Sequence, residues 1–223
     1  DYIVGQSIVG QSKIDYKSNC GNMTAATAPF AVEMGLVEHL TEPTTIVHLF
    51  NLNTNKAIDV EVPVKDGQFD NEGSCAIAGV EGTAGELKVN FLDPAGAKTG
   101  KLFPTGKAKD VLDLGEEGSI EASILDVSNP MVIVRASDLG IKGTELPAEV
   151  DANKALAKKL EAIRGAACVE MGFAKDLADA TANSPAVPKV GFVAAPVDFT
   201  DISGKSVDAS EMDVCARVIS VFK

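Results

Sequence analysis

Long hydrophobic runs are missing from this sequence of 223 residues. No segment approaches the roughly 20 consecutive apolar residues that a membrane-spanning helix needs. The N-terminal segment also lacks the layout of a signal peptide. We therefore expect a soluble, cytoplasmic protein that does not bind membranes. The length suffices for one large domain or two small ones, each with its own core.

Cysteine is sparse, and its spacing does not suggest a metal site. The chain has four cysteines, far apart and without a CxxC pair: Cys20, Cys75, Cys168 and Cys215. This pattern excludes a disulfide framework and the usual zinc motifs, and it fits a reducing cytosol. His39 and His48 lack neighbours suited to metal ligation, so no metal is expected.

Basic residues are few compared with acidic ones. The 20 lysines and arginines against 32 aspartates and glutamates give a formal net charge of −12. This excess of negative charge argues against a general role in binding nucleic acid or a membrane surface. It does not exclude an anionic small substrate, because local N–H donors decide that question. GxGxxG, phosphate-loop and GxSxG motifs are also missing.

The stretch from Asp15 to Ala26 carries the strongest chemical signal. Asn19-Cys20-Gly21-Asn22 precedes a run of small residues that predicts the start of a helix. Unpaired N–H groups and the positive end of the helix dipole favour a thiolate at such a position. The same N–H groups can hold a carboxylate. The alternative is a small buried thiol, which is the commoner fate of a free cysteine and the one expected for Cys168 and Cys215.

Hydrophobic periodicity predicts strands and one helix in the first part of the chain. Pro29 lies inside the predicted helix, which we expect to be kinked or to start late because proline has no N–H. The many small residues of this helix predict close packing and burial. The alternation of apolar residues after position 57 predicts a hairpin. Single strands are predicted over 2–9, 13–16, 44–52, 57–64 and 86–92, and a pair of strands over 68–78. The helix covers 22–36, and 93–118 is a crossover.

The second part of the chain repeats this layout of strands and helices. Strands are predicted over 119–127, 131–134 and 189–194, and a helix capped by Asp151 runs to about Gly172. A capping box at 208–211 predicts a second helix that buries Met212, Cys215, Val218, Ile219 and Phe222. Asn129-Pro130 interrupts a strand. It marks either an edge strand or a bulge, where proline is tolerated, or a position at which the Asn129 amide points into a cleft. Two similar sets of strands and helices, one in each part of the chain, predict an α+β protein.

The order of several motifs resembles the PrpF family of aconitate-type isomerases, which have the diaminopimelate-epimerase-like fold. The first motif is Asn19-Cys20-Gly21-Asn22-Met23-Thr24-Ala25-Ala26, followed by Pro29-Phe30-Ala31. Further motifs agree with the family in order and spacing, and together they cover nearly the whole chain: Leu102-Phe103-Pro104-Thr105-Gly106, Asp126-Val127-Ser128-Asn129-Pro130, Gly143-Thr144-Glu145-Leu146-Pro147, Leu160-Glu161-Ala162-Ile163-Arg164 and Ser184-Pro185-Ala186.

The resemblance implies two pseudo-symmetric halves, each with a sheet around a central helix and with the active site in the cleft between them. Residues 1–117 would form part of the first half, with the Asn-Cys-Gly-Asn loop and its helix, and 118–223 part of the second. We expect a piece of a longer protein, incomplete at both ends. The family's catalytic lysine would precede residue 1, so this piece alone is expected to be inactive.

The resemblance also implies a cofactor-independent isomerase that moves a double bond in an unsaturated di- or tricarboxylate. Cys20 would remove and return the proton, and Asn129 would face the cleft from the second half. The partner would be the small polycarboxylate itself, and a homo-oligomer is left open. The substrate carboxylate would be held by Asn19, Gly21, Asn22 and Met23.

Two alternatives remain at this point. An amino-acid racemase or epimerase on the same fold would pair two cysteines, and no second Asn-Cys-Gly loop is present in these residues. A non-catalytic relative would keep the fold without the chemistry. The sequence does not decide which polycarboxylate an isomerase would take.

Overall fold

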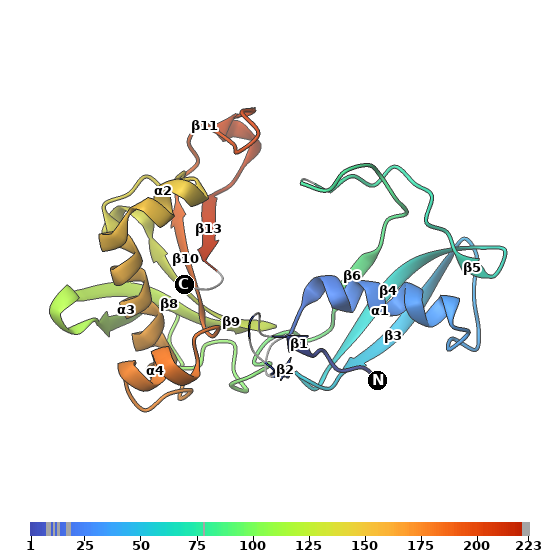
Figure 1. Ribbon diagram of the computed structural model, residues 1–223, viewed down its shortest axis with the longest axis horizontal. Helices are drawn as coiled ribbons and strands as arrows, with labels where there is room; N and C mark the ends of the chain where they lie inside the picture. The colour runs from blue at the N-terminus through green and yellow to red at the C-terminus, as the bar shows by residue number, and fades with distance from the viewer. Residues whose placement is uncertain (8–9, 11, 13, 17–18, 78, 220–223) are drawn as a thin grey trace. The chain divides into compact units, whose positions relative to one another are not determined.

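The computed structural model describes residues 1–7, 10, 12, 14–16, 19–77 and 79–219. The chain divides into two compact units, Asp1–Pro94 and Ala95–Lys223. Each unit has a β-sheet with a helix packed on it (Figure 1). The predicted α+β class is therefore confirmed. The division of the family halves after residue 117 stays a prediction, since it is a different boundary from that of the compact units.

The first unit is built around the central strand β4. β4 (Lys56–Lys65) pairs antiparallel with β3 (Thr44–Asn51), β5 (Gln68–Phe69) and β6 (Lys88–Phe91). Helix α1 (Gly21–Glu33) lies against this sheet (Figure 1). A separate two-stranded ribbon joins β1 (Gln6–Ser7) to β2 (Ile14–Asp15).

The hairpin of β3 and β4 confirms the alternation expected from the sequence. Every second side chain is buried on both strands, from Thr45 to Asn51 on β3 and from Ile58 to Val64 on β4. Helix α1 buries Ala28 and Val32 against this apolar face. A period of two places all these side chains on one side of the sheet, so the pattern fixes the register of the pair.

Helix α1 encloses Pro29, as predicted, and differs from its predicted range of 22–36 at both ends. It begins at Gly21, so the late start is wrong, and it continues through Pro29 to Glu33. Pro29 cannot donate a backbone hydrogen bond within the helix, but its side chain is buried. The expected burial holds for one face, whereas the opposite face leaves Met23 and Phe30 exposed to solvent.

Three strand predictions in the first unit are too long. Residues 2–9 provide a bridge from Tyr2 to Asn51 and strand β1, and residues 8–9 lie outside the described part. The range 13–16 reduces to β2, and its first residue is not described. The range 68–78 provides β5 and one bridge from Cys75 to Ala84, with residue 78 not described. The N–H of Glu72 is bound by the Asp70 carboxylate, which bends the chain away from an extended course.

The second unit contains a five-stranded sheet among its described residues. Its strand order is β13-β10-β9-β8-β7, and β9 and β10 run parallel while the other pairs are antiparallel. The strands are β7 (Asp110–Asp113), β8 (Ser119–Val127), β9 (Asn129–Arg135), β10 (Lys189–Ala194) and β13 (Cys215–Ile219). Strand β7 lies inside the predicted crossover 93–118, where no strand was expected.

Helix α3 (Lys154–Glu170) covers one face of this sheet and buries the predicted apolar stripe, including Leu156, Leu160 and Ile163. Asp151 does not cap it, because Pro147 begins a separate short helix, α2 (Pro147–Ala152). Asn153 is the cap, and its Oδ1 accepts from the N–H of Leu156 at 3.0 Å. Helix α4 (Leu177–Asn183) follows, and the hairpin of β11 (Phe199–Thr200) and β12 (Ser206–Val207) projects beyond the sheet (Figure 1).

The helix predicted after residues 208–211 is wrong. A short 3₁₀ turn, η3 (Ala209–Glu211), follows Asp208, and the chain then forms strand β13. Five residues of β13 pair antiparallel with β10, and this pairing satisfies a sheet edge that a helix would leave open. Cys215 is buried as expected, but Val218 is exposed, and Phe222 lies outside the described residues. None of the described helices has the length and apolar character needed to cross a membrane.

Candidate active site at the start of helix α1

Cys20 is the N-cap residue of α1. Its backbone is extended, with φ −129° and ψ 113°, and its side chain makes no capping hydrogen bond. The first hydrogen bond of the helix runs from the N–H of Thr24 to the carbonyl oxygen of Cys20 at 3.0 Å. The thiol is half-buried. The predicted placement of this cysteine at a helix N-terminus is therefore confirmed.

The first turn of α1 presents backbone donors without acceptors. Gly21, Asn22 and Met23 precede the first intrahelical N–H donor, and no hydrogen bond from their N–H groups occurs within the described part of the chain. All three residues are exposed. The first turn carries no acidic side chain that would neutralise the positive end of the helix dipole. This arrangement suits an anion placed next to the Cys20 thiol.

Asn19 and Cys20 are held from behind by a network of buried polar side chains. The Nδ2 of Asn51 donates to the Oδ1 of Asn19 at 2.9 Å and to the hydroxyl of Tyr2 at 2.7 Å. The Tyr2 hydroxyl lies 2.7 Å from Oγ1 of Thr24, which donates to the Cys20 carbonyl at 3.0 Å. The five residues therefore connect the end of strand β3 to the loop before α1.

The site residues predicted from the sequence did not include Asn51, Tyr2 or Thr24. A signal for Asn51 was present, because it occupies the fourth buried position of β3, after Thr45, Val47 and Leu49. A polar side chain at a core position of an alternating strand must find hydrogen-bond partners there. Tyr2 and Thr24 carry no comparable local signal.

Asn129, the site residue predicted in the second half, lies in the second unit. It is the first residue of β9, directly after Ser128, whose positive φ of 62° turns the chain from β8 into β9. Proline is tolerated at position 130 because the pairing of β9 with β10 begins one residue later, at Met131. The half-buried Asn129 thus sits at the tip of a tight hairpin.

Asp126 supports the same hairpin from inside the second unit. It is fully buried, and its Oδ2 accepts from the N–H groups of Lys98 and Thr99 and from the Thr99 hydroxyl, at 2.6 to 2.8 Å. Its Oδ1 is buried without a hydrogen-bond partner among the described residues. The carboxylate therefore anchors the segment around Lys98 next to the turn that carries Asn129.

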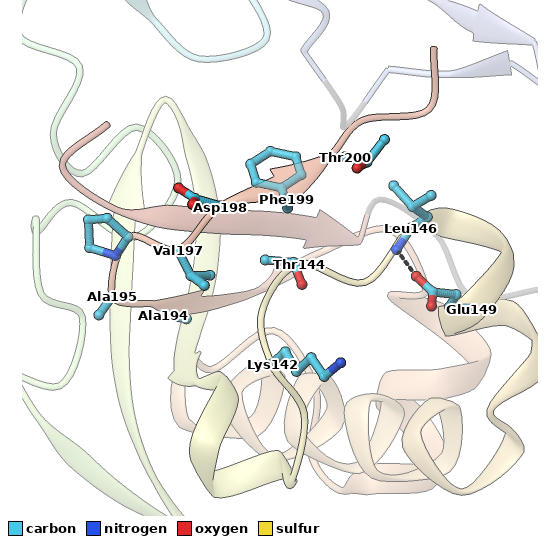
Figure 2. Close-up of a pocket in the computed structure, with 11 residues that line it drawn as sticks. Lys142, Thr144, Leu146, Glu149, Ala194, Ala195, Val197, Asp198, Phe199 and Thr200 are labelled. Carbon is cyan, nitrogen blue, oxygen red and sulfur yellow. Dashed lines mark hydrogen bonds between the residues drawn. The ribbon is translucent and has the colours of Figure 1, made fainter. Parts of the chain in front are cut away.

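A pocket of about 740 Å³ also lies in the second unit, between segments 142–149 and 194–200 (Figure 2). Its wall combines apolar side chains such as Val197 and Phe199 with the charged Lys142 and Glu149. The Glu149 carboxylate accepts from the N–H of Leu146 at 2.7 Å. None of the predicted site residues lines this pocket, so it gives no support to their assignment.

The described residues do not form a metal-binding cluster. Within the described part of the chain, no group of three or more His, Cys, Asp or Glu side chains comes together in a way that could hold a metal ion. The site at the start of α1 is instead composed of a thiol, an amide and backbone N–H groups.

The family of this protein follows from comparison with known proteins. A family model described as PrpF protein matches residues 1–223. This chain belongs to the PrpF family. The resemblance drawn from its motifs is thereby confirmed.

Individual relatives agree with this membership. A 3-methylitaconate isomerase of Eubacterium barkeri is 40% identical over 98% of this chain and 57% of that protein. A 2-methyl-aconitate isomerase of Shewanella oneidensis is 34% identical over 100% of this chain and 57% of that protein. The crystal structure of methylitaconate-delta-isomerase matches with a TM-score of 0.87 and 39% identity, covering 98% of this chain and 56% of that one. The chain thus spans somewhat more than half the length of these relatives.

Proposed function

We propose that the protein carrying this chain is a cofactor-independent isomerase that shifts a double bond in an unsaturated di- or tricarboxylate. The observation that carries this proposal is the position of Cys20 as the N-cap of α1, beside three backbone N–H groups that find no acceptor among the described residues. Membership of the PrpF family and the names of the relatives, which act on methylitaconate and 2-methylaconitate, support the substrate class.

The chemistry requires a group that removes a proton next to a conjugated double bond and returns it to another carbon. In this proposal the thiol of Cys20 alternates between its protonated and ionised forms and exchanges that proton. The charge left on the substrate spreads into a carboxylate as an enolate-like species. Backbone N–H groups at the start of α1 would stabilise that charge as it forms.

The remaining predicted residues have binding roles in this proposal. Gly21, Asn22 and Met23 contribute N–H groups to one substrate carboxylate, and Asn19 contributes its side-chain amide. Asn129 keeps the substrate-binding role that the family resemblance implies for it. Location in the reducing cytoplasm is part of the same proposal, and the four unpaired cysteines support it.

The test uses the complete natural protein that carries this chain. It is incubated in deuterated water with aconitate, 2-methylaconitate, 3-methylitaconate and 4-oxalomesaconate, and both product formation and deuterium incorporation are followed. We expect turnover of at least one substrate with solvent deuterium in the product. Cys20→Ser should lower kcat by about 10²–10⁴-fold, the range expected for loss of an acid–base group.

Cys75→Ser is the matched control, because Cys75 is also half-buried but lies outside the helix start. It should keep the wild-type rate. Equal activity of Cys20→Ser and wild type would remove Cys20 from the chemistry, and absence of turnover on the whole panel would contradict the proposed substrate class.

A further inference from the structure

We propose that Asn51 is a positioning residue that fixes the amide orientation of Asn19 and the peptide of Cys20. This inference rests on the proposed function, because it concerns how the substrate carboxylate is held. It does not depend on contact between Asn51 and substrate, since Asn51 is fully buried.

The backbone determines which way the Asn51 amide faces. Its Oδ1 accepts from the N–H of Asn53 at 2.7 Å and from the N–H of Thr54 at 3.1 Å. A backbone N–H can only donate, so these two contacts assign the oxygen to this side of the amide. The Nδ2 of Asn51 is thereby directed toward the loop before α1.

The two hydrogens of Asn51 Nδ2 serve two acceptors. One is the Oδ1 of Asn19 at 2.9 Å, and the other is the hydroxyl oxygen of Tyr2 at 2.7 Å. The contact with Asn19 turns its oxygen inward and leaves its Nδ2 on the other side. That Nδ2 has no acceptor among the described residues, and Asn19 is only half-buried. Asn19, the residue directly before Cys20, therefore has a side-chain N–H donor that no described residue uses.

The second branch reaches the Cys20 peptide. The Thr24 hydroxyl donates its single hydrogen to the Cys20 carbonyl at 3.0 Å, so it must accept from Tyr2 in their 2.7 Å contact. Tyr2 in turn accepts from Asn51. Every donor in the path from Asn51 through Tyr2 and Thr24 to Cys20 is thus assigned in one direction.

Burial makes this arrangement stiff. Asn51 and Thr24 are both 0% exposed, so water does not compete for their hydrogen bonds. The backbone of Tyr2 is held on both sides, by the carbonyl of Phe50 at 3.0 Å and by the N–H of Leu52 at 2.9 Å. A substrate carboxylate would then meet a preset amide donor and the N–H groups of α1 together, which reduces the ordering cost of binding.

Asn51→Asp tests the inference with little change in shape. The aspartate keeps an acceptor for the N–H groups of Asn53 and Thr54 but cannot donate to Asn19. The Asn19 amide would then flip to donate inward, and its oxygen would face the substrate carboxylate. In the complete protein we expect kcat/KM to fall about tenfold or more, chiefly through a higher KM.

A double-mutant cycle separates positioning from general damage. In the Asn19→Ala background, Asn51→Asp should lower kcat/KM by a clearly smaller factor than in the wild type, because only the branch through Tyr2 and Thr24 is then left to lose. Asn53→Asp is the control, since Asn53 is in the same turn but binds the backbone of Val4 and Tyr16. Its effect should be the same in both backgrounds. An equal effect of Asn51→Asp in the two backgrounds would overturn the inference.

Hydrogen–deuterium exchange gives a readout that needs no turnover. Asn51→Asp should speed exchange at the amides of residues 19–26 about tenfold, whereas Asn53→Asp should leave that peptide near the wild-type rate. Unchanged exchange in Asn51→Asp overturns the inference even if the protein is an active isomerase. Faster exchange supports the inference even if no polycarboxylate is turned over and the proposed function fails.

A second variant covers the case in which Asn51→Asp does not fold. Tyr2→Phe removes the donor to Thr24 and leaves the contact between Asn51 and Asn19 in place. It should speed exchange in the same peptide and lower kcat/KM by a similar factor with or without Asn19→Ala, because it acts on the Cys20 branch. Wild-type exchange in Tyr2→Phe would remove that branch from the inference.

Discussion

Arg164 and Glu161 form a doubly hydrogen-bonded ion pair one turn apart on helix α3. Nε and Nη2 of the arginine each lie 2.7 Å from a different carboxylate oxygen. The third nitrogen, Nη1, donates to the carbonyls of Ser184 at 2.7 Å and Val187 at 3.2 Å. Arg164 is 1% exposed, so its side chain ties α3 to the turn before β10 from inside the unit.

Arg164→Lys should lower the free energy of unfolding by about 3 kcal/mol, because a lysine cannot make the paired contacts and leaves buried acceptors unpaired. Arg135→Lys is the matched control. Arg135 also bonds two carboxylates, Glu121 and Asp138, but its side chain is 54% exposed, so its replacement should cost much less stability than that of Arg164. Chemical denaturation of both variants measures the difference, and equal losses would contradict the structural role given to Arg164.

Glu161 should make the stability of this chain sensitive to acid. Burial raises the pKa of this carboxyl, but the hydrogen bonds from Arg164 and Thr181 outweigh it and hold the pKa below the ordinary value of 4.5. A lowered folded-state pKa stabilises the protein above the unfolded value, and this contribution is lost as pH falls through the folded value.

We therefore expect Glu161→Gln to reduce the loss of unfolding free energy between about pH 5 and pH 3. Thr181→Val removes one of the two causes, the hydrogen bond at 2.7 Å, and should give an intermediate slope. Denaturant titrations at each pH provide the comparison. A Glu161→Gln protein with the wild-type pH slope would show that the ion pair does not hold the pKa down.

Glycine is needed at position 143 for two reasons, its left-handed backbone conformation and the closeness of a neighbouring side chain. Its φ is +91°, and a Cβ at this position would lie 2.5 Å from the Cβ of Ala194 on β10. Gly140 has a φ of +70° but open space around it. Gly140→Ala should cost about 1 kcal/mol of stability for the left-handed backbone alone.

Gly143→Ala adds a clash with the sheet and should cost about 3 kcal/mol in total. The two variants differ in packing while sharing the backbone penalty, so their difference in thermal unfolding isolates the contact with Ala194. Matching transition temperatures would mean that β10 can move aside without cost.

Asp126 provides a similar comparison for the hairpin that carries Asn129. Asp126 accepts three hydrogen bonds, from Lys98 and Thr99. Asp126→Ala removes this buried acceptor, although the Thr99 hydroxyl can still donate to the Lys101 carbonyl at 3.1 Å, and should cost about 3 kcal/mol. Asp201 also accepts three hydrogen bonds, from Ser203 and Lys205, but it is partly exposed. Water can replace those contacts, so Asp201→Ala should cost much less stability than Asp126→Ala. Similar costs for both would argue that the Asp126 site is open to water.

The elements that were predictable from sequence are those whose pattern is local. The alternation in β3 and β4 and the apolar stripe of α3 each record a single buried face. Strand β13 was assigned to a helix because its apolar residues recur every three or four positions. Its structure depends on pairing with the edge of β10, which is distant in sequence. The spacing of apolar residues within a short segment does not reveal such a pairing.

The candidate site divides in the same way. The residues from Asn19 to Met23 adjoin one another in sequence, so their helix-start geometry was predictable. Asn51 contacts Asn19 across 32 residues and Tyr2 across 49, which no local pattern encodes. Asn51 and Asp126 share one recognisable feature: each is a polar residue at a buried position of an alternating strand. Such positions therefore help to locate supporting networks.

The four cysteines differ in their access to solvent. Cys20 and Cys75 are half-buried, whereas Cys168 and Cys215 are buried, and burial raises the pKa of the Cys168 thiol despite its hydrogen bonds and the nearby charge of Arg164. Iodoacetamide should therefore modify Cys20 and Cys75 in the native complete protein, and the other two only after unfolding.

Aconitate at saturating concentration should then slow modification of Cys20 about tenfold or more, because a carboxylate bound to the N–H groups of α1 covers the neighbouring thiol. Cys75 lies away from that helix start and is the internal control, and succinate, which has carboxylates but no double bond, tests whether charge alone suffices. Peptide mass spectrometry resolves the two sites. Equal slowing at Cys20 and Cys75, or no slowing at either, would place the carboxylate elsewhere in the protein.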